Sequence, residues 1–183
     1  MISSQSQRSA TRRRFLGGAA AVLSLAATPL QAATLPRRLF LHNLHTKEDL
    51  DIVYRRGEVV ERTALATLNH FLRDWRRDEI RPIDPRLFDL MAVIADRLGR
   101  PPRFEIISGY RSPETNAMLH RAAGGVAKRS LHMVGRAIDL RLEGTKLRDL
   151  RNTALQLEAG GVGYYPKSEF VHIDTGRVRT WNG

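Results

Sequence analysis

The chain has 183 residues, about the length of one domain, so a second catalytic domain is not expected. Its composition, 42% hydrophobic and 27% charged, is that of a globular protein and excludes a collagen-like or disordered chain. The formal net charge is +11, and the lack of cysteine excludes disulfides and thiolate metal sites, so any metal needs histidine and carboxylate ligands.

Residues 1–33 have the three parts of a bacterial signal peptide. A basic head ending in Arg12-Arg13-Arg14-Phe15-Leu16 precedes an apolar run of about 15 residues and the small residues of Gln31-Ala32-Ala33. The run is short for a membrane span, so we expect cleavage and no lasting anchor. The arginine pair resembles a twin-arginine export signal. We therefore predict a signal peptide over 1–33, one domain over 34–183, and a location in the periplasm or cell envelope.

The part after residue 33 is still basic. It keeps 26 basic and 19 acidic residues, a net charge of +7. Such a charge favours anionic polymers, and for an exported bacterial protein the nearby candidates are cell-wall peptides with free carboxylates and membrane headgroups, although the charge could also serve solubility alone. Nucleic-acid binding is not expected, because the mixed charges of residues 73–78 are typical of a solvated helix face.

The elements expected in the first half of the domain are a hairpin and two helices. Strands over 39–41 and 50–54 are joined by a polar turn. Apolar residues at helical spacing predict a helix over 64–75, with Trp75 inward, and another over 87–98 that starts after Asp84-Pro85.

The second half mixes strands and helices. We expect strands at 104–107 and 137–142, helices at 113–123 and 146–159, and three last strands at 161–165, 170–174 and 177–181. The last three suggest an antiparallel sheet. The sequence therefore predicts an α+β fold, with helices packed on a small antiparallel sheet.

Asp139 and His172 are placed to face each other across two strands. Asp139 lies in an apolar alternation, on the face opposite to Ile138 and Leu140, and a carboxylate there needs a partner. The same alternation places His172 and Asp174 on one face of their strand. If the two strands pair, Asp139 and His172 lie about 5 Å apart, close enough to share one metal ion.

His132 would reach the same point from the loop before residue 137, which Gly135 allows to turn back. Two imidazoles and one carboxylate leave one position of a tetrahedral Zn²⁺ open for water, as in catalytic zinc sites. Such a water is nucleophilic at neutral pH, so the site could hydrolyse an amide. An oxygenase iron site made of His132, His172 and Asp174 is an alternative that the several helices disfavour.

Three ordered motifs resemble the M15 family of zinc peptidases. Residues 130–139 match its Ser-x-His-x-x-Gly-x-Ala-x-Asp motif, and residues 108–111 and 170–176 are also similar to it. The likeness extends from His42 to Trp181 and is strongest to the murein endopeptidase K branch.

The resemblance implies a fold, a site and a substrate. The fold would be of the hedgehog and D-Ala-D-Ala peptidase type, the zinc ligands would be His132, Asp139 and His172, and the substrate would be peptidoglycan stem peptide. Arg111 would hold a substrate carboxylate or the developing oxyanion, although by its position alone it could form a surface salt bridge.

The general base is open between two acids. Many M15 enzymes place an acid three residues before the last ligand, which is Glu169 here. Strand alternation instead favours Asp174, on the same face as His172. The two could also be, respectively, a solvated acid and a carboxylate that supports a ligand.

The sequence thus predicts a zinc metalloendopeptidase that hydrolyses peptide cross-links of peptidoglycan. The alternative is a catalytically inert, zinc-containing module that binds the cell wall, because activity requires Glu169 or Asp174 at the zinc-bound water.

Overall fold

The fold is described from a computed structural model, in which Met1 and residues 35–123 and 126–183 are described. Apart from Met1, the predicted signal peptide over 1–33 lies outside the described residues. The strands of the described part are β1 (Arg37–Asn43), β2 (Asp49–Arg56), β3 (Val59–Val60), β4 (Arg103–Ser108), β5 (Ala137–Leu142), β6 (Gly161–Tyr165), β7 (Phe170–Asp174) and β8 (Arg179–Asn182). The helices are α1 (Arg62–Phe71), α2 (Arg86–Arg97), α3 (Pro113–Ala123), the 3-10 helix η1 (Leu131–Val134) and α4 (Leu147–Gln156).

All these strands join one sheet, in the order β3-β2-β1-β4-β5-β7-β6-β8. Most neighbours are antiparallel, which confirms the predicted α+β class. Two pairs are parallel. β1 and β4 can be parallel because the connection between them contains α1 and α2, and a parallel pair needs such a crossover.

The other parallel pair corrects the prediction for the C-terminal strands. β6 and β7 are antiparallel as expected, but β8 pairs with β6, not with β7, and runs parallel to it. The other edge of β7 is already taken by β5, so β8 can add only at the outer edge of β6.

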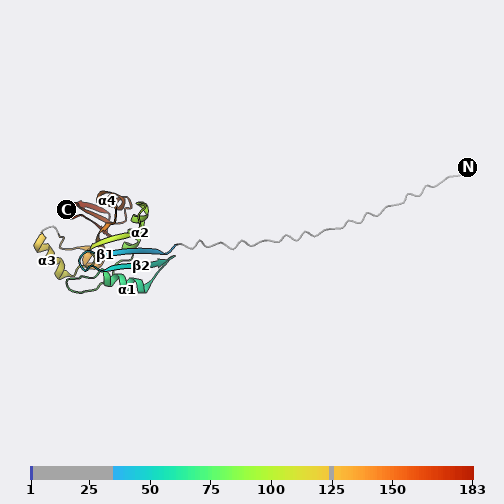
Figure 1. The fold of residues 1–183 in the computed structure, drawn as a ribbon. Helices are drawn as coiled ribbons and strands as arrows, with labels where there is room; N and C mark the ends of the chain where they lie inside the picture. The colour runs from blue at the N-terminus through green and yellow to red at the C-terminus, as the bar shows by residue number, and fades with distance from the viewer. Residues whose placement is uncertain (2–34, 124–125) are drawn as a thin grey trace. The chain divides into compact units, whose positions relative to one another are not determined.

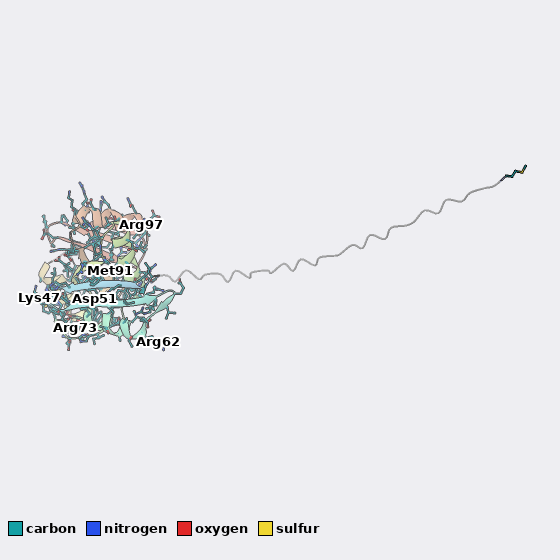
Figure 2. All side chains as sticks on the ribbon, turned by 45° about the vertical axis from the view of Figure 1, so that its right-hand side comes forward. Lys47, Asp51, Arg62, Arg73, Met91 and Arg97 are labelled. Carbon is teal, nitrogen blue, oxygen red and sulfur yellow. The ribbon has the colours of Figure 1, made fainter. Side chains whose placement is uncertain are left out.

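The two faces of the sheet differ. On one face, alternate strand residues such as Leu39, Phe104 and Leu140 form the hydrophobic core with α1, α2 and α4. Figure 1 shows α1 beside β2. Met91 of α2 is fully buried, whereas the charged Arg97, labelled with it in Figure 2, is exposed. The opposite face, which we call the open face, carries polar and aromatic side chains.

Trp75 differs from its prediction. The helix expected over 64–75 ends at Phe71, because the chain then folds back into a bridge between Asp74 and Glu79. Trp75 lies within this turn, is 39% exposed, and stacks on His45 with the ring centroids 4.9 Å apart. It therefore lies at the surface and not in the core. Among the described residues, no helix has the length and apolar character to cross a bilayer.

Candidate metal centre

The centre of the open face is the pair of strands β5 and β7. They are antiparallel, and Asp139 is the direct partner of His172. The predicted cross-strand pairing is therefore confirmed. Both residues are buried, with 6% and 7% exposure.

His132 comes from η1, the turn before β5. Ser130 caps this turn, since its Oγ accepts a hydrogen bond from the backbone N–H of His132 at 3.3 Å. Gly135 ends the turn with φ of +67°, and a Cβ there would lie 2.1 Å from the carbonyl oxygen of Pro82. Only glycine fits both constraints. The prediction that Gly135 lets His132 fold back over Asp139 is confirmed.

Three potential ligand atoms meet at one point. His132 Nε2 lies 3.2 Å from Asp139 Oδ1 and 3.1 Å from His172 Nδ1, and His172 Nδ1 lies 2.8 Å from Asp139 Oδ1. Ligands of a tetrahedral zinc ion, at their usual bond lengths, are separated by about 3.3 Å. The spacing of the three atoms fits one small cation.

The outer hydrogen bonds set the tautomers of both imidazoles. His132 Nδ1 lies 2.7 Å from the carbonyl oxygen of Gly109, and His172 Nε2 lies 3.1 Å from Asp174 Oδ2. Both partners are acceptors, so these nitrogens carry the protons. When both imidazoles are neutral, the lone pairs of His132 Nε2 and His172 Nδ1 then face each other and Asp139. Two lone pairs and a carboxylate need a cation between them, so the residues fit a metal ion.

The pKa values agree with a cation site. Burial lowers the pKa of His132 to about 4 and keeps this imidazole neutral. Burial alone would raise the pKa of Asp139, but the two histidines outweigh it and hold that pKa far below the usual range. Burial would lower the pKa of His172, yet hydrogen bonds to Asp139 and Asp174 outweigh it and raise the pKa.

Arg111 lies at the same site, beyond the end of β4. Its side chain is 12% exposed, and its Nη2 is 3.8 Å from Asp139 Oδ2. Its buried Nε has no hydrogen-bond partner in the described part of the chain. An arginine with an unused donor beside a ligand cluster can bind a further anionic or carbonyl oxygen.

Asp174 lies behind His172. It is fully buried and accepts hydrogen bonds from the backbone N–H groups of Gly161 and Gly176 and from both terminal nitrogens of Arg179. Burial alone would raise its pKa, but these partners and His172 hold the pKa well below the usual range. Its carboxylate contacts Nε2 of His172, the nitrogen opposite to the one that faces the other two ligand atoms.

Glu169 lies away from the ligand cluster. The chain bends at this residue, whose φ is +55°. Such a bend is needed if Glu169 is to turn toward the face of β7 that carries His172 and act as the general base. Its side chain is 75% exposed, however, and its carboxylate is 3.7 Å from Arg141. Neither Glu169 nor Asp174 is among the residues that line the cavity at the site.

That cavity has a volume of about 820 Å³ and opens from the ligand cluster toward the C-terminal strands. Its walls include Arg111, Asp139 and His172 and three residues not singled out as site residues from the sequence, Tyr165, Arg179 and Trp181. Arg179 and Trp181 are visible in the sequence as Arg-x-Trp, and Tyr165 as part of the strand predicted at 161–165. Their place beside His172 follows only from the strand order β7-β6-β8.

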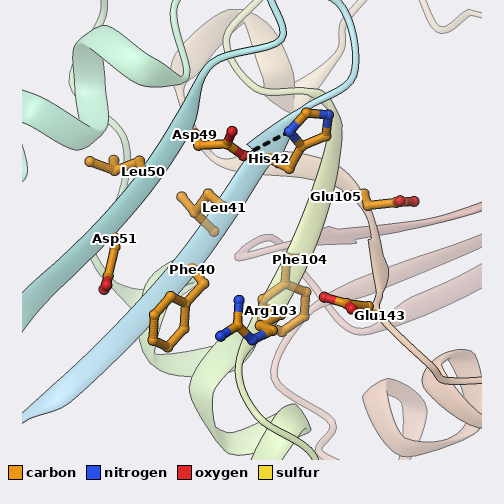
Figure 3. Close-up of a pocket in the computed structure, with 10 residues that line it drawn as sticks. All are labelled: Phe40, Leu41, His42, Asp49, Leu50, Asp51, Arg103, Phe104, Glu105 and Glu143. Atoms are coloured by element: carbon orange, nitrogen blue, oxygen red, sulfur yellow. Dashed lines mark hydrogen bonds and ion pairs between the residues drawn. The ribbon is translucent and has the colours of Figure 1, made fainter.

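A second hollow lies on the open face over β1, β2 and β4 (Figure 3). It contains the pair His42 and Asp49, with Nδ1 and Oδ1 2.8 Å apart. Within residues 35–123 and 126–183, no third ligand joins this pair. Among the described residues, His132, Asp139 and His172 are the one group that meets the geometry for a metal ion.

Comparison with known proteins agrees with this site. The M15 family model described as peptidoglycan L,D-endopeptidase MepK matches residues 31–181. The peptidoglycan L,D-endopeptidase MepK of Escherichia coli strain K12 is 46% identical over 177 residues, which cover 94% of this chain and 97% of the relative. The probable peptidoglycan L,D-endopeptidase MepK of Haemophilus influenzae is 42% identical over 163 residues, or 88% and 85%. No solved structure is significantly similar.

The family match includes η1, β5 and β7, the three elements that supply the ligand atoms, as well as the Arg111 turn. The resemblance seen in the sequence motifs is thereby confirmed along nearly the whole domain. The chain therefore belongs to the M15 peptidase family, in the branch of the peptidoglycan L,D-endopeptidase MepK.

Proposed function

We propose that the chain is a zinc-dependent L,D-endopeptidase that hydrolyses peptide cross-links of peptidoglycan in the periplasm, after export by a twin-arginine signal over residues 1–33. The observation that carries the proposal is the buried convergence of His132, Asp139 and His172 beside an open cavity. Membership of a peptidase family and the L,D-endopeptidase activity for which the relatives are named support the same reaction.

The two proposed histidine ligands each have a supporting contact. His132 is held by the carbonyl oxygen of Gly109, and His172 by Asp174. Zn²⁺ bound there would polarise the scissile carbonyl and supply a nucleophilic hydroxide at neutral pH. Asp174 keeps the proton of His172 on Nε2, so Nδ1 stays available as a ligand. We assign Asp174 this positioning role.

Substrate binding is assigned to the basic wall of the cavity. Arg111 and Arg129 both line this cavity. Stem peptides carry carboxylates, which a guanidinium can bind through two parallel hydrogen bonds. A carboxylate or developing oxyanion held by Arg111 would lie next to Asp139 and hence next to the scissile bond.

Glu169 is the proposed general base. Both oxygens of Asp174 are occupied by His172, Arg179 and backbone donors, whereas Glu169 is exposed and its carboxylate lies 3.7 Å from Arg141. A rotation of the Glu169 side chain on the bend before β7 would bring its carboxylate toward the cavity. Glu169→Gln should lower kcat by about 100-fold at unchanged zinc content. A kcat within twofold of wild type would exclude Glu169 as the base.

The proposed reaction is tested with purified protein lacking residues 1–33 and with isolated sacculi. Zinc-loaded protein should release soluble muropeptides, EDTA should stop release, and added Zn²⁺ should restore it. Mass spectrometry of the products identifies the bond, and cleavage at an L,D linkage is expected. Zinc-loaded protein that binds sacculi without any product would contradict the endopeptidase and support the inert wall-binding module.

A further inference from the structure

The side chain of Trp181 extends over Gly163 of β6 toward the proposed metal ligand His172. Gly163 is the direct partner of His172 on one side and of Trp181 on the other. A Cβ on Gly163 would lie 2.6 Å from the indole, so only glycine leaves room for it. The indole therefore lies across β6, with its centroid 5.1 Å from that of the His172 ring.

The indole also holds Tyr165. Trp181 Nε1 is 2.8 Å from Tyr165 Oη, and the Tyr165 ring stacks on Phe170 at a centroid distance of 4.4 Å. An indole N–H can only donate, so Tyr165 Oη is the acceptor and its own proton is directed elsewhere. In the described part of the chain this proton has no acceptor, and Tyr165 lines the same cavity as Arg111 and His172.

We infer that Tyr165 is a catalytic hydrogen-bond donor, whose hydroxyl proton binds a carbonyl oxygen of the substrate in the cavity, and that Trp181 is its positioning residue. The inference rests on the proposed endopeptidase function. Tyr165 keeps its proton throughout, so no bond is made or broken at the hydroxyl. A donor already fixed by Trp181 and Phe170 needs no reorganisation when charge develops on the substrate oxygen.

The neighbouring Tyr164 is a natural control. It points to the opposite face of β6, packs against the hydrophobic core, and lies under the guanidinium of Arg151 at 5.7 Å. It is not among the residues that line the cavity at the metal centre. The two tyrosines thus share a strand and a chemistry but differ in face.

The test compares Tyr165→Phe, Trp181→Phe, the double variant and Tyr164→Phe on a purified cross-linked muropeptide. Tyr165→Phe keeps the stack on Phe170 and should lower kcat/KM by about 100-fold. Trp181→Phe keeps an aromatic ring over Gly163 and should cost about fivefold, in line with the loss of one orienting hydrogen bond. The double variant should be no worse than Tyr165→Phe, because Trp181 acts through Tyr165. Tyr164→Phe should stay within twofold of wild type.

Zinc content and the midpoint of urea unfolding, measured on every variant, separate this role from a structural one. Both should be unchanged in Tyr165→Phe. Activity of Tyr165→Phe within threefold of wild type, or additive losses in the double variant, would overturn the inference while leaving the endopeptidase intact. If wild type itself cleaves nothing, the proposed function fails, and calorimetric binding of the uncleaved muropeptide decides the donor: an equal Kd for wild type and Tyr165→Phe would overturn it.

Discussion

Two of the histidine–carboxylate pairs on the open face of the sheet have the same separation. His42 and Asp49 in the hairpin are 2.8 Å apart, as are His172 and Asp139 in the middle of the sheet. Exposure distinguishes them: the side chains of the first pair are 39% and 82% exposed, and those of the second 9% each. Water screens the first pair, whereas burial strengthens every electrostatic interaction of the second.

The second difference is the number of ligand atoms. η1 adds His132 to the buried pair, while no described residue adds a third ligand to the hairpin pair. A short histidine–carboxylate contact on a sheet is thus not by itself a metal site. Burial and a third converging ligand make it a candidate metal centre.

The largest expected effect comes from removing a ligand. His172→Ala should abolish stoichiometric zinc binding and lower muropeptide release by more than about 1000-fold, because a two-ligand site binds zinc poorly. His42→Ala is the matched change in the exposed pair. Its zinc content and muropeptide release should both stay within twofold of wild type. The measurements are metal analysis of dialysed protein and chromatography of digested sacculi. Full hydrolysis by His172→Ala would refute the ligand assignment.

Next in size is the contact behind the ligand. Asp174→Asn keeps the shape of the side chain but removes the charge that orients His172 and pairs with Arg179. Zinc affinity should fall by about 10–100-fold, as for other residues that support metal ligands. Asp49→Asn, which changes the carboxylate of the exposed pair, is the control and should have no effect. Competition with a chelating dye measures the zinc affinity of both variants and of wild type. An affinity of Asp174→Asn equal to that of wild type would contradict the positioning role.

The proton count of zinc binding is the third test. Without metal at about pH 6, His132 is neutral because its pKa is lowered to about 4, and His172 is protonated because its pKa is raised. Zinc should therefore displace about one proton, and its affinity should rise about tenfold per pH unit until the raised pKa of His172 is passed. Calorimetry of zinc binding in two buffers of different ionisation enthalpy gives the number of protons released. Two protons would show that His132 is not held neutral.

The smallest effect is expected for the hairpin pair itself. A double-mutant cycle of His42→Ala and Asp49→Ala should give a coupling free energy of about 0.5 kcal/mol or less, since water screens exposed ion pairs. Urea unfolding of the four proteins provides the values. A coupling of several kcal/mol would mean that exposure does not separate the two pairs.

Much of the fold could be predicted because its signals are local. Alternation over residues 137–142 and 170–174 predicted two strands and the face that carries Asp139 and His172, and the structure confirms both. Helix α2 was predicted within one residue of its bounds from its apolar spacing. Trp75 was placed wrongly because the chain turns back between Asp74 and Glu79, where Asp74 also accepts a hydrogen bond from Ser112, 38 residues away.

By itself, the sequence determined the family, the element types and the three proposed ligands, because periodicity and motif spacing are properties of short segments. The tertiary structure alone decided which strand edges were free. The strand order placed β8 beside β6 and Trp181 across Gly163. The tertiary structure also placed Asp174 behind His172 and left Glu169 outside the ligand cluster. Such contacts join residues distant in the chain, so only long-range packing could assign roles to these side chains.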